Sequence, residues 1–348
     1  MSASQAERRG FDPRLPLLKV LIVRTDRLGD VILTLPMASA IRKGLPNARI
    51  SFLVREYTRP IARRAPDVDE IIIADNRESI GKLIHLIRTI KPDVVFFPNP
   101  RFDTAVAAWM ARVPLRIGTG YRWYSLLFNR RIFEHRKTAK YHEAVFNLRM
   151  LKEIGISADY DQLPNIKLRS EEIAIVDEWL STSLGAGSKF AVLHVGSGGS
   201  GKDWPLDQFI VLARALAERS NLSIVLTGSQ EDNDRLSFIA YEIGKERALL
   251  FTGRSLPELA ALLSRASIVI SNSTGPGHLA AVLGVPTVGL FPLPASLSKE
   301  RWGFRGPHVA NVSPRPVADC PNCRECTCME RLEVGRVVDE VEQLMGKL

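Results

Sequence analysis

Short apolar runs alternate with longer segments of helical periodicity along most of the chain, a pattern typical of a parallel sheet covered by helices. In the first half, the predicted strands lie at residues 19–24, 49–55, 69–75, 93–98 and 115–118. In the second half, they lie at residues 190–195, 222–227, 249–252, 267–271 and 286–291. The pattern therefore predicts an α/β fold with two similar units in tandem.

These two series of strands also suggest the domain organisation. We assign residues 1–165 to an N-terminal Rossmann-like domain, 166–188 to a polar linker, 189–332 to a C-terminal Rossmann-like domain with a cysteine-rich tail, and 333–348 to a final helix. The apolar face of that helix suggests that it packs across the domains. Ligands of open α/β sheets bind outside the carboxyl ends of the strands, so we expect the chemistry in strand-to-helix loops at a shared cleft.

Charge is distributed unevenly between the two halves. The 348 residues carry a net charge of +9; residues 1–165 hold 28 basic and 17 acidic side chains, whereas residues 166–348 hold 19 and 21. A basic domain attracts nucleic acid, acidic lipid head groups or a phosphorylated substrate, and no nucleic-acid-binding motif accompanies the charge. The apolar runs are too short to span a bilayer and the first 20 residues lack a signal-peptide pattern, so we expect a cytoplasmic protein.

The first candidate loop is R-T-D-R-L-G-D at residues 24–30, directly after the first strand. Gly29 permits a tight backbone, and Asp30 stands at the entrance of the next helix, where a carboxylate could act as a base. Asp is also a preferred N-cap residue, so a purely structural role is an equally ordinary interpretation. Asp26 is a weaker candidate, because it could pair with Arg24 or Arg27.

The second candidate loop is G-S-G-G-S-G-K-D-W-P at residues 196–205. It satisfies both G-x-G-x-x-G and G-x-x-x-x-G-K, but Asp203 replaces the Ser or Thr of a phosphate-binding loop, and Trp204-Pro205 delays the helix that a dinucleotide fold requires. Small residues still let backbone N–H groups approach an anion, and Lys202 adds a positive charge. A solvent-exposed flexible loop is the alternative interpretation.

Two further loops carry polar groups. The segment S-N-S-T-G-P-G-H at residues 271–278 presents unpaired N–H donors at a helix entrance and suits a diphosphate, with His278 either in the site or in a structural hydrogen bond. In T-G-S-Q-E-D at residues 227–232, Asp232 could accept hydrogen bonds from ribose hydroxyls or could simply favour the helix dipole.

All four cysteines lie within nine residues, at Cys320, Cys323, Cys326 and Cys328. A structural zinc site usually draws its ligands from two separated pairs, and this cluster has the ligand count without the spacer. Reduced thiols, a metal site and a redox-sensitive surface all remain open. We predict no metal in the catalytic site.

Taken together, the loops resemble those of glycosyltransferase family 9, the heptosyltransferases of lipopolysaccharide inner-core synthesis. The resemblance covers residues 18–346 and rests on the order and spacing of the segments at 24–30, 196–205, 227–232 and 273–280 and the cysteine-rich tail. It implies the GT-B architecture, in which two Rossmann-like domains face each other across a cleft. Two departures are Ser273, where many members have Asp, and a more compressed cysteine tail.

The resemblance implies specific roles for residues of this chain. Asp30 would be the general base that deprotonates the acceptor hydroxyl in an inverting, metal-independent transfer of a heptose or related sugar. The implied donor-binding residues are Ser197, Gly198, Lys202, Asp232, Ser273, Thr274, Gly275, Gly277 and His278. The implied acceptor-binding residues, in the basic N-terminal domain, are Arg27, Arg55, Arg59 and Arg122.

The implied substrates are a nucleotide-sugar donor, with ADP-heptose favoured, and an anionic glycolipid acceptor at the inner membrane surface; no cofactor is required. Three alternatives remain. The chain could be a GT-B transferase that uses another nucleotide sugar in O-antigen or capsule assembly. It could be a nucleotide-sugar-binding protein without turnover, although a base at the cleft edge argues against this. It could also be an NAD-dependent oxidoreductase, for which only the glycine pattern speaks.

Overall fold

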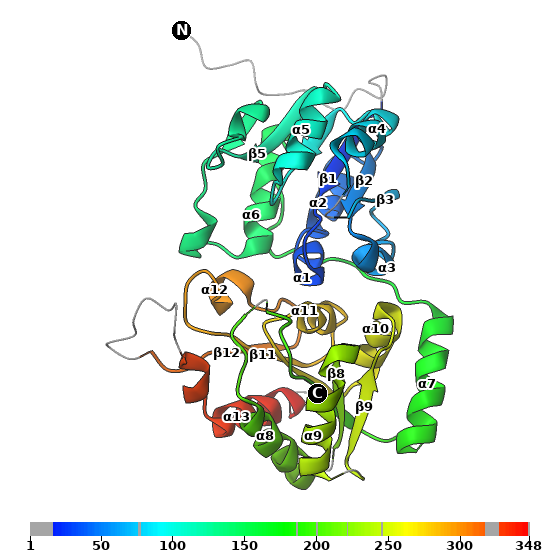
Figure 1. Ribbon diagram of the computed structural model, residues 1–348, viewed down its shortest axis with the longest axis vertical. Helices are drawn as coiled ribbons and strands as arrows, with labels where there is room; N and C mark the ends of the chain where they lie inside the picture. Colours follow the sequence, from blue (N-terminus) through cyan, green and yellow to red (C-terminus); the bar gives the residue numbers. More distant parts are fainter. Residues whose placement is uncertain are drawn as a thin grey trace. The chain divides into compact units, whose positions relative to one another are not determined.

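The computed structural model describes residues 17–75, 78–185, 187–199, 201–220, 222–244, 246–316 and 327–346. The chain divides into two compact units. The first contains the residues up to Asp26, Thr34–Glu134 and Asn147–Gln162; the second contains Arg27–Leu33, His135–Phe146 and the chain from Leu163 onward. Each unit is therefore assembled from several stretches of chain, and each has its own sheet (Figure 1).

The first unit contains a parallel sheet of six strands in the order β3-β2-β1-β4-β5-β6. Its strands are β1 (Lys19–Val23), β2 (Arg49–Val54), β3 (Glu70–Ile73), β4 (Val94–Phe96), β5 (Leu115–Thr119) and β6 (Arg130–Ile132). Its helices include α2 (Pro36–Gly44), α3 (Arg59–Ala62), α4 (Ile80–Ile90) and α5 (Phe102–Met110), with the 3₁₀ turns η1 (Glu56–Thr58), η2 (Ser125–Leu127) and η4 (Met150–Ile154).

Both faces of this first sheet are buried, as the long apolar runs of its strands require. Leu21 of β1 packs in one core cluster with Leu83 and Ile87 of α4. Val20 and Ile22, which point to the opposite face because side chains alternate along a strand, are also fully buried. Helices therefore cover both sides of the sheet, as in other parallel α/β folds.

The second unit contains a parallel sheet of six strands in the order β12-β11-β10-β7-β8-β9. Its strands are β7 (Phe190–His194), β8 (Ser223–Gly228), β9 (Ala248–Thr252), β10 (Ile268–Asn272), β11 (Thr287–Leu290) and β12 (Val309–Val312). Its helices include α1 (Leu28–Ile32), α7 (Ser170–Leu184), α8 (Leu206–Arg219), α9 (Asn233–Ile243), α10 (Leu256–Arg265), α11 (Gly275–Val282), α12 (Lys299–Trp302) and α13 (Val334–Met345). Its 3₁₀ turns are η3 (Arg136–Thr138), η5 (Gln230–Asp232) and η6 (Cys328–Arg331), and α6 (Glu143–Arg149) begins in this unit and ends in the first.

The two sheets share one topology. In each, the first strand lies beside the fourth, and the order outward from that pair is the 3-2-1-4-5-6 order of a Rossmann fold. The order reverses between β7 and β10 in the second unit, so the loops that follow these strands diverge to leave a ligand site at their carboxyl ends. The predicted tandem α/β fold is confirmed, and all ten predicted strands are present.

Three details differ from the sequence predictions. The short edge strands β6 and β12 were not predicted. The stretch assigned as a linker, residues 166–188, belongs to the second unit; its helix α7 packs on α10 and carries an ion pair of 2.7 Å between Asp177 and Arg265. Helix α13 packs on α8 and β12 inside the second unit, where Val338 and Val341 join the core cluster, so the expectation that it packs across the domains was wrong. No helix in the described residues is long and apolar enough to cross a membrane.

Candidate active site

The glycine-rich loop after β7 is held at both ends by one buried side chain, Asn272 at the end of β10. Its Oδ1 accepts the backbone N–H of Trp204 at 3.0 Å, and its Nδ2 donates to the carbonyl of Val195 at 2.5 Å. Trp204 itself is fully buried, and its indole N–H donates to the carbonyl of Leu332 at 2.9 Å. Both ends of the loop are therefore fixed to the same side chain, and Lys202 lies on the exposed part of the loop.

This loop needs glycine for conformational reasons. Gly198 and Gly199 have φ angles of 53° and 72°, in the left-handed region that other residues adopt at a cost. Ser197 is buried, and its carbonyl accepts from the guanidinium of Arg27 at 3.5 Å. The predicted delay of the helix is also present, since α8 begins only at Leu206.

The loop after β10 leads directly into α11. Thr274 is the N-cap residue in extended conformation, and its side chain makes no capping hydrogen bond. The backbone N–H groups of Gly275 and Gly277 lie in the first turn, where a helix has no acceptors of its own, and Pro276 between them has no N–H. This end of α11 thus offers donors and a partial positive charge to an anion, as the sequence predicts.

Helix α1 lies tightly against the start of α11 because two glycines meet there. A methyl group added at Gly275 would come within 2.7 Å of Cβ of Leu28 and 3.1 Å of the nitrogen of Gly29. A methyl group added at Gly29 would come within 2.8 Å of Cδ2 of His278. The absence of side chains at both positions lets the two backbones approach each other, and Asp30 is the next residue of α1 after this contact.

Asp30 occupies the third position of α1, not its N-cap, so the structural alternative raised from the sequence was wrong in detail. The N-cap residue is Arg27, and a carboxylate oxygen of Asp30 accepts its backbone N–H at 3.3 Å. The side chain is partly exposed. Asp26 lies in the first unit and pairs with Arg24, whose Nε is 2.9 Å from Asp26 Oδ2, as its weaker candidacy suggested.

Asp232 lies at the end of η5, beside the glycine-rich loop. Its carboxylate accepts two hydrogen bonds from Ser229, at 2.9 Å from the backbone N–H and 2.7 Å from the hydroxyl. Burial acts to raise the pKa of Asp232, but these hydrogen bonds and the charge of Arg235 outweigh it, so the pKa is lowered. A methyl group at Gly196 would lie 3.6 Å from Asp232 Oδ1, so this carboxylate faces the start of the loop in its ionised form.

Sequence reasoning missed a neutral histidine at the end of β7. The ring of His194 lies with its Nδ1 at 2.9 Å from Oγ1 of Thr227 on the neighbouring strand. Burial lowers the pKa of His194 to about 4, although the nearby Asp232 acts in the opposite direction. Its only sequence signal is weak: a histidine at the end of an apolar strand.

His278 is buried inside the second unit rather than exposed in the loop. Its ring packs edge-on against Phe304 with centroids 4.8 Å apart, and its solvent exposure is 4%. Burial, followed by the charge of His142, lowers the pKa of His278 to about 3. The ring is therefore neutral at physiological pH and forms part of the wall behind the start of α11.

A second cluster that sequence reasoning missed joins residues 135–146 to α12. Nε2 of His142 lies 2.8 Å from the carbonyl of Gly303, and the N–H of Ala144 donates to Nδ1 of the same ring. These contacts fix the tautomer that carries its proton on Nε2. The carboxylate of Glu143, 2% exposed, lies between Arg136 at 2.5 Å and Arg301 at 3.3 Å. No motif marks this cluster, because Arg301 lies 158 residues from Glu143 in the sequence.

Most of the predicted donor-binding residues come together in the second unit. Besides the contacts above, a methyl group at Gly201 would lie 3.6 Å from Cβ of Ser273, so the glycine-rich loop and the loop before α11 are neighbours. The loops after β7, β8 and β10 all leave the same edge of the sheet. The residues gathered at this edge are Ser197, Gly198, Lys202, Asp232, Ser273, Thr274, Gly275 and Gly277, with His278 behind them.

The predicted acceptor-binding arginines are divided between the two units. Arg27 belongs to the second unit, whereas Arg55, Arg59 and Arg122 belong to the first. Arg55 stacks over the ring of Tyr57 at 5.0 Å, and Arg59 pairs with Glu56 at 2.6 Å. Within the first unit, Arg122 follows β5, whereas Arg55 follows β2. The strands β1 and β4 lie between β2 and β5, so these two strands are three spacings apart, about 14 Å.

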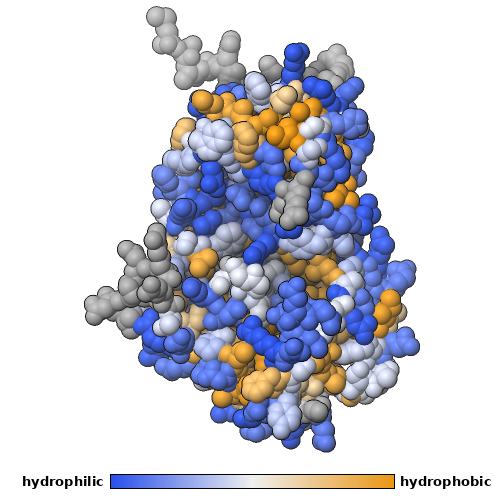
Figure 2. Space-filling view, viewed as in Figure 1, coloured by the Kyte–Doolittle hydropathy of each residue, from blue (hydrophilic) through white to orange (hydrophobic). Residues whose placement is uncertain are grey.

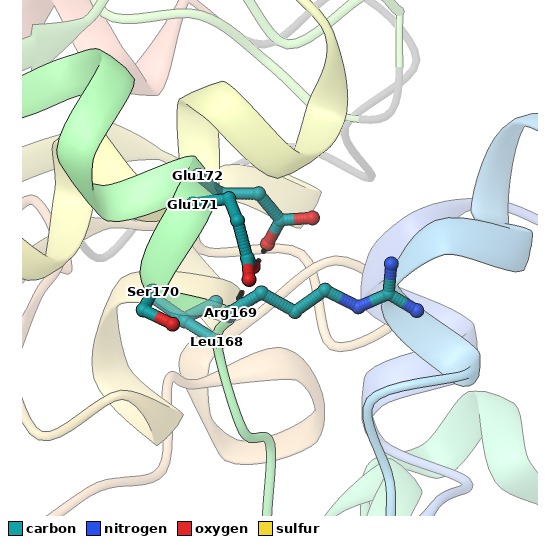
Figure 3. Close-up of a pocket in the computed structure, with 5 residues that line it drawn as sticks. All are labelled: Leu168, Arg169, Ser170, Glu171 and Glu172. Carbon is teal, nitrogen blue, oxygen red and sulfur yellow. Dashed lines mark hydrogen bonds between the residues drawn. The ribbon is translucent and has the colours of Figure 1, made fainter.

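One hollow lies outside this edge. A hollow of about 590 Å³ at the start of α7 is lined by Leu168, Arg169, Ser170, Glu171 and Glu172. Figure 3 shows that the guanidinium of Arg169 points away from both carboxylates, while its backbone N–H donates to Glu172 at 3.4 Å. This is a capped helix end that contains none of the predicted site residues.

Of the clustered cysteines, Cys320, Cys323 and Cys326 lie outside the described residues. Cys328 is buried in the core of the second unit. Within the described part of the chain, no group of three or more His, Cys, Asp or Glu side chains is placed to hold a metal ion.

Comparison with known proteins shows which proteins this chain resembles. A lipopolysaccharide heptosyltransferase 3 of Escherichia coli is 24% identical over 282 residues, which cover 76% of this chain and 80% of that protein. A glycosyltransferase family 9 structure from Veillonella parvula superposes with a TM-score of 0.81 at 23% identity, covering 95% of this chain and 98% of the other. The structure of E. coli ADP-heptose lipopolysaccharide heptosyltransferase II superposes with a TM-score of 0.78 at 20% identity, covering 95% and 99%.

These solved structures show that the fold is GT-B. The family model of glycosyltransferase family 9 (heptosyltransferase) matches residues 80–330, which is most of the chain. The match includes the glycine-rich loop, the turn before α11 and Asp232. The chain therefore belongs to glycosyltransferase family 9, the heptosyltransferase family, and it is a glycosyltransferase.

Proposed function

We propose that this protein transfers a heptose from ADP-heptose to the core region of a lipopolysaccharide acceptor, with inversion at the anomeric carbon and with Asp30 as the general base. The observation that carries the proposal is the contact between Gly29 and the start of α11. We infer that this contact brings the carboxylate of Asp30 near a helix end that offers unpaired N–H groups to an anion. The E. coli relative that shares the fold is named for ADP-heptose, which supports the choice of donor.

The donor diphosphate is proposed to bind at the carboxyl edge of the second sheet. As the bond to the anomeric carbon breaks, negative charge collects on the departing ADP and must be met by fixed donors. The first-turn N–H groups of α11, the backbone of the loop at Gly198 and the charge of Lys202 can supply them. Asp232, ionised and turned toward the start of that loop, would accept hydrogen bonds from the ribose hydroxyls.

The acceptor hydroxyl is a weak nucleophile at neutral pH. A carboxylate that takes its proton in the transition state typically contributes 10²- to 10⁴-fold to the rate. Asp30 is partly exposed and can serve in this way, while Arg27 is tied to the carbonyl of Ser197 and would orient the same helix end. We propose that Arg55 and Arg59 hold the acidic groups of the acceptor and that the reaction takes place at the cytoplasmic face of the inner membrane.

The base is tested with a matched pair of carboxylate variants. Asp30→Asn should lower kcat at least about a hundredfold while the dissociation constant of ADP-heptose stays within a few-fold. Glu258→Gln is the control, because Glu258 also occupies the third position of its helix and accepts the backbone N–H of the N-cap residue, Ser255, at 2.9 Å. If Asp30→Asn turns over at the normal rate, another base carries the reaction.

Two further measurements test the donor and the absence of a metal. ADP-heptose should raise the Tm more than ADP, UDP or GDP derivatives of other sugars, since a ligand stabilises the fold in proportion to its occupancy. A different preferred sugar would point to Ser273, which lies beside the glycine-rich loop where many relatives carry Asp. Turnover should survive treatment with a chelator; loss of turnover that one divalent ion restores would overturn the metal-free mechanism.

A further inference from the structure

The stretch from residue 101 to residue 133 of the first unit exposes an unusual set of large apolar side chains. Phe102, Trp109, Met110, Tyr121, Trp123, Leu126 and Phe133 are all between 43% and 82% exposed. Half of the exposed large hydrophobic residues found in the described part of the chain therefore fall in residues 101–133. We call this set, with its neighbouring arginines, the aromatic-arginine surface. In Figure 2, apolar colour gathers over the first unit near α5.

Helix α5 has its large apolar side chains on the outside. Its buried positions are the small residues Thr104, Ala105, Ala107 and Ala108. Its outward stripe holds Phe102, Val106, Trp109 and Met110, which are spaced as one helical face. A surface helix normally carries polar residues there. Phe102, Trp109 and Met110 remain exposed in the folded unit, so we take them as contact groups for an apolar partner.

The loop after β5 extends this surface. The ring centroids of Phe102 and Trp123 lie 4.8 Å apart, and those of Tyr121 and Phe133 lie 5.7 Å apart. These contacts hold Trp123 and its neighbours in place even though Trp123 is 77% exposed and Leu126 is 82% exposed. The apolar groups therefore stand on an ordered part of the unit.

The same stretch of chain is rich in arginine. Residues 101–133 contain six arginines and a single acidic residue, Asp103, which pairs with Arg101. Arg112, Arg122, Arg130 and Arg131 are exposed and form no ion pair with the described residues. Arg130 and Arg131 lie on β6, the edge strand of the sheet, where charges also prevent pairing with another chain.

We propose that the aromatic-arginine surface binds the face of an anionic lipid bilayer. Tryptophan and tyrosine rings favour the interface between head groups and acyl chains, and arginines beside them attract acidic head groups. A second copy of the chain is a poor partner for this surface, because like charges of both copies would meet. Single-stranded nucleic acid would stack on the aromatic rings, but its bases cannot stack on the aliphatic side chains of Leu126 and Met110. The proposal depends on the proposed transfer function in one respect only, namely that the acceptor is a membrane lipid.

Vesicle sedimentation of the full-length protein tests the proposal without any turnover. The protein should bind vesicles of phosphatidylcholine and phosphatidylglycerol in a 7:3 ratio at least tenfold more tightly than pure phosphatidylcholine vesicles, and salt should weaken the binding. The double variants Trp123→Ser with Leu126→Ser, and Arg130→Gln with Arg131→Gln, should each lose at least about tenfold in this binding.

A matched control separates this surface from general stickiness. Phe238 and Tyr241 of α9 are 55% and 68% exposed, and the double variant Phe238→Ser with Tyr241→Ser should bind vesicles as the wild type does. All variants should keep the wild-type Tm and the wild-type rate on a detergent-free soluble acceptor analogue. Equal binding of both vesicle types, or full binding by the Trp123 and Leu126 variant, would overturn the proposal. It would also be overturned if those two substitutions abolished dimerisation or oligonucleotide binding instead.

Discussion

Replacement of Gly29 by alanine tests how far the reaction depends on the close approach of α1 and α11. The added methyl group would lie 2.8 Å from Cδ2 of His278, and ordinary contact begins at about 3.4 Å. The ring of His278 has little room to withdraw, since Phe304 lies on its other side at 4.8 Å between centroids. Helix α1 must therefore move outward, by about 0.6 Å for a tight contact and about 1.2 Å for a relaxed one.

The effects on stability and on rate should differ in size. Overpacking of this kind costs about 1–3 kcal/mol, whereas alanine in place of glycine inside a helix returns about 1 kcal/mol. The net loss in the free energy of unfolding should be no more than about 2 kcal/mol. A shift of about 1 Å in a reacting group can lower a rate by up to about a hundredfold. Because Asp30 follows Gly29, kcat should fall ten- to a hundredfold while the protein remains folded.

The assay combines ADP release under saturating substrates with urea unfolding of the same preparation. Gly335→Ala is the control, because Gly335 lies in α13 with nothing within 4 Å of its added methyl group, so stability should rise slightly and kcat should not change. Wild-type kcat and stability in Gly29→Ala would show that the glycine contact does not set the position of Asp30, and the proposed base would lose its main structural support.

Two other predictions concern stability. Glu143→Gln leaves two arginines without their buried partner and should cost about 3–5 kcal/mol in urea unfolding, whereas Asp177→Asn in an exposed pair should change stability by less than about 1 kcal/mol; equal effects would contradict the reasoning. The buried ring of His278 has a folded pKa of about 3, so the unfolded chain binds more protons between pH 6.5 and 3. The contribution of His278 to the free energy of unfolding is complete above pH 6.5 and decreases as the pH falls, by about 2 kcal/mol at pH 5. The unfolding free energy of His278→Asn, measured in urea, should therefore depend less on pH in this range than that of the wild type.

The sequence predicted the fold because the strands of both sheets are buried on both faces. Continuous apolar runs such as those of β1 and β7 stand out against any neighbouring segment. The edge strand β6 has the opposite character, since Arg130 and Arg131 are exposed and its pairing depends on β5 alone. Such a strand forms because it pairs with its neighbour in the sheet, and no local sequence pattern predicts it.

The candidate site was predicted only where loops follow strands. Lys202, Asp232 and Thr274 could be found because glycine-rich or polar loops interrupt the apolar pattern at the ends of strands. Asn272 could not, since its role depends on reaching two backbone groups that lie about seventy residues away in the sequence. The capping geometry of Asp30 was also beyond prediction, because it depends on a helix that begins three residues earlier than the hydrophobic pattern suggests.

Family membership removes two of the alternatives left open by the sequence. The glycine pattern at Gly196, Gly198 and Gly201 does not mark an oxidoreductase, and a binding protein without turnover does not fit an enzyme family. A transferase that acts on another nucleotide sugar remains the alternative that the thermal-shift comparison addresses.

The interleaving of the chain between the two units bears on how the protein can be dissected. Residues 27–33, which pack against Gly275 at the start of α11, are separated in sequence from the rest of the second unit by more than a hundred residues. A fragment that starts at Leu163 would lack that short helix and the stretch with Glu143, and would expose backbone that the intact chain covers. A recombinant second unit would thus need both missing pieces grafted back before any affinity measured on it could stand for that of the whole enzyme.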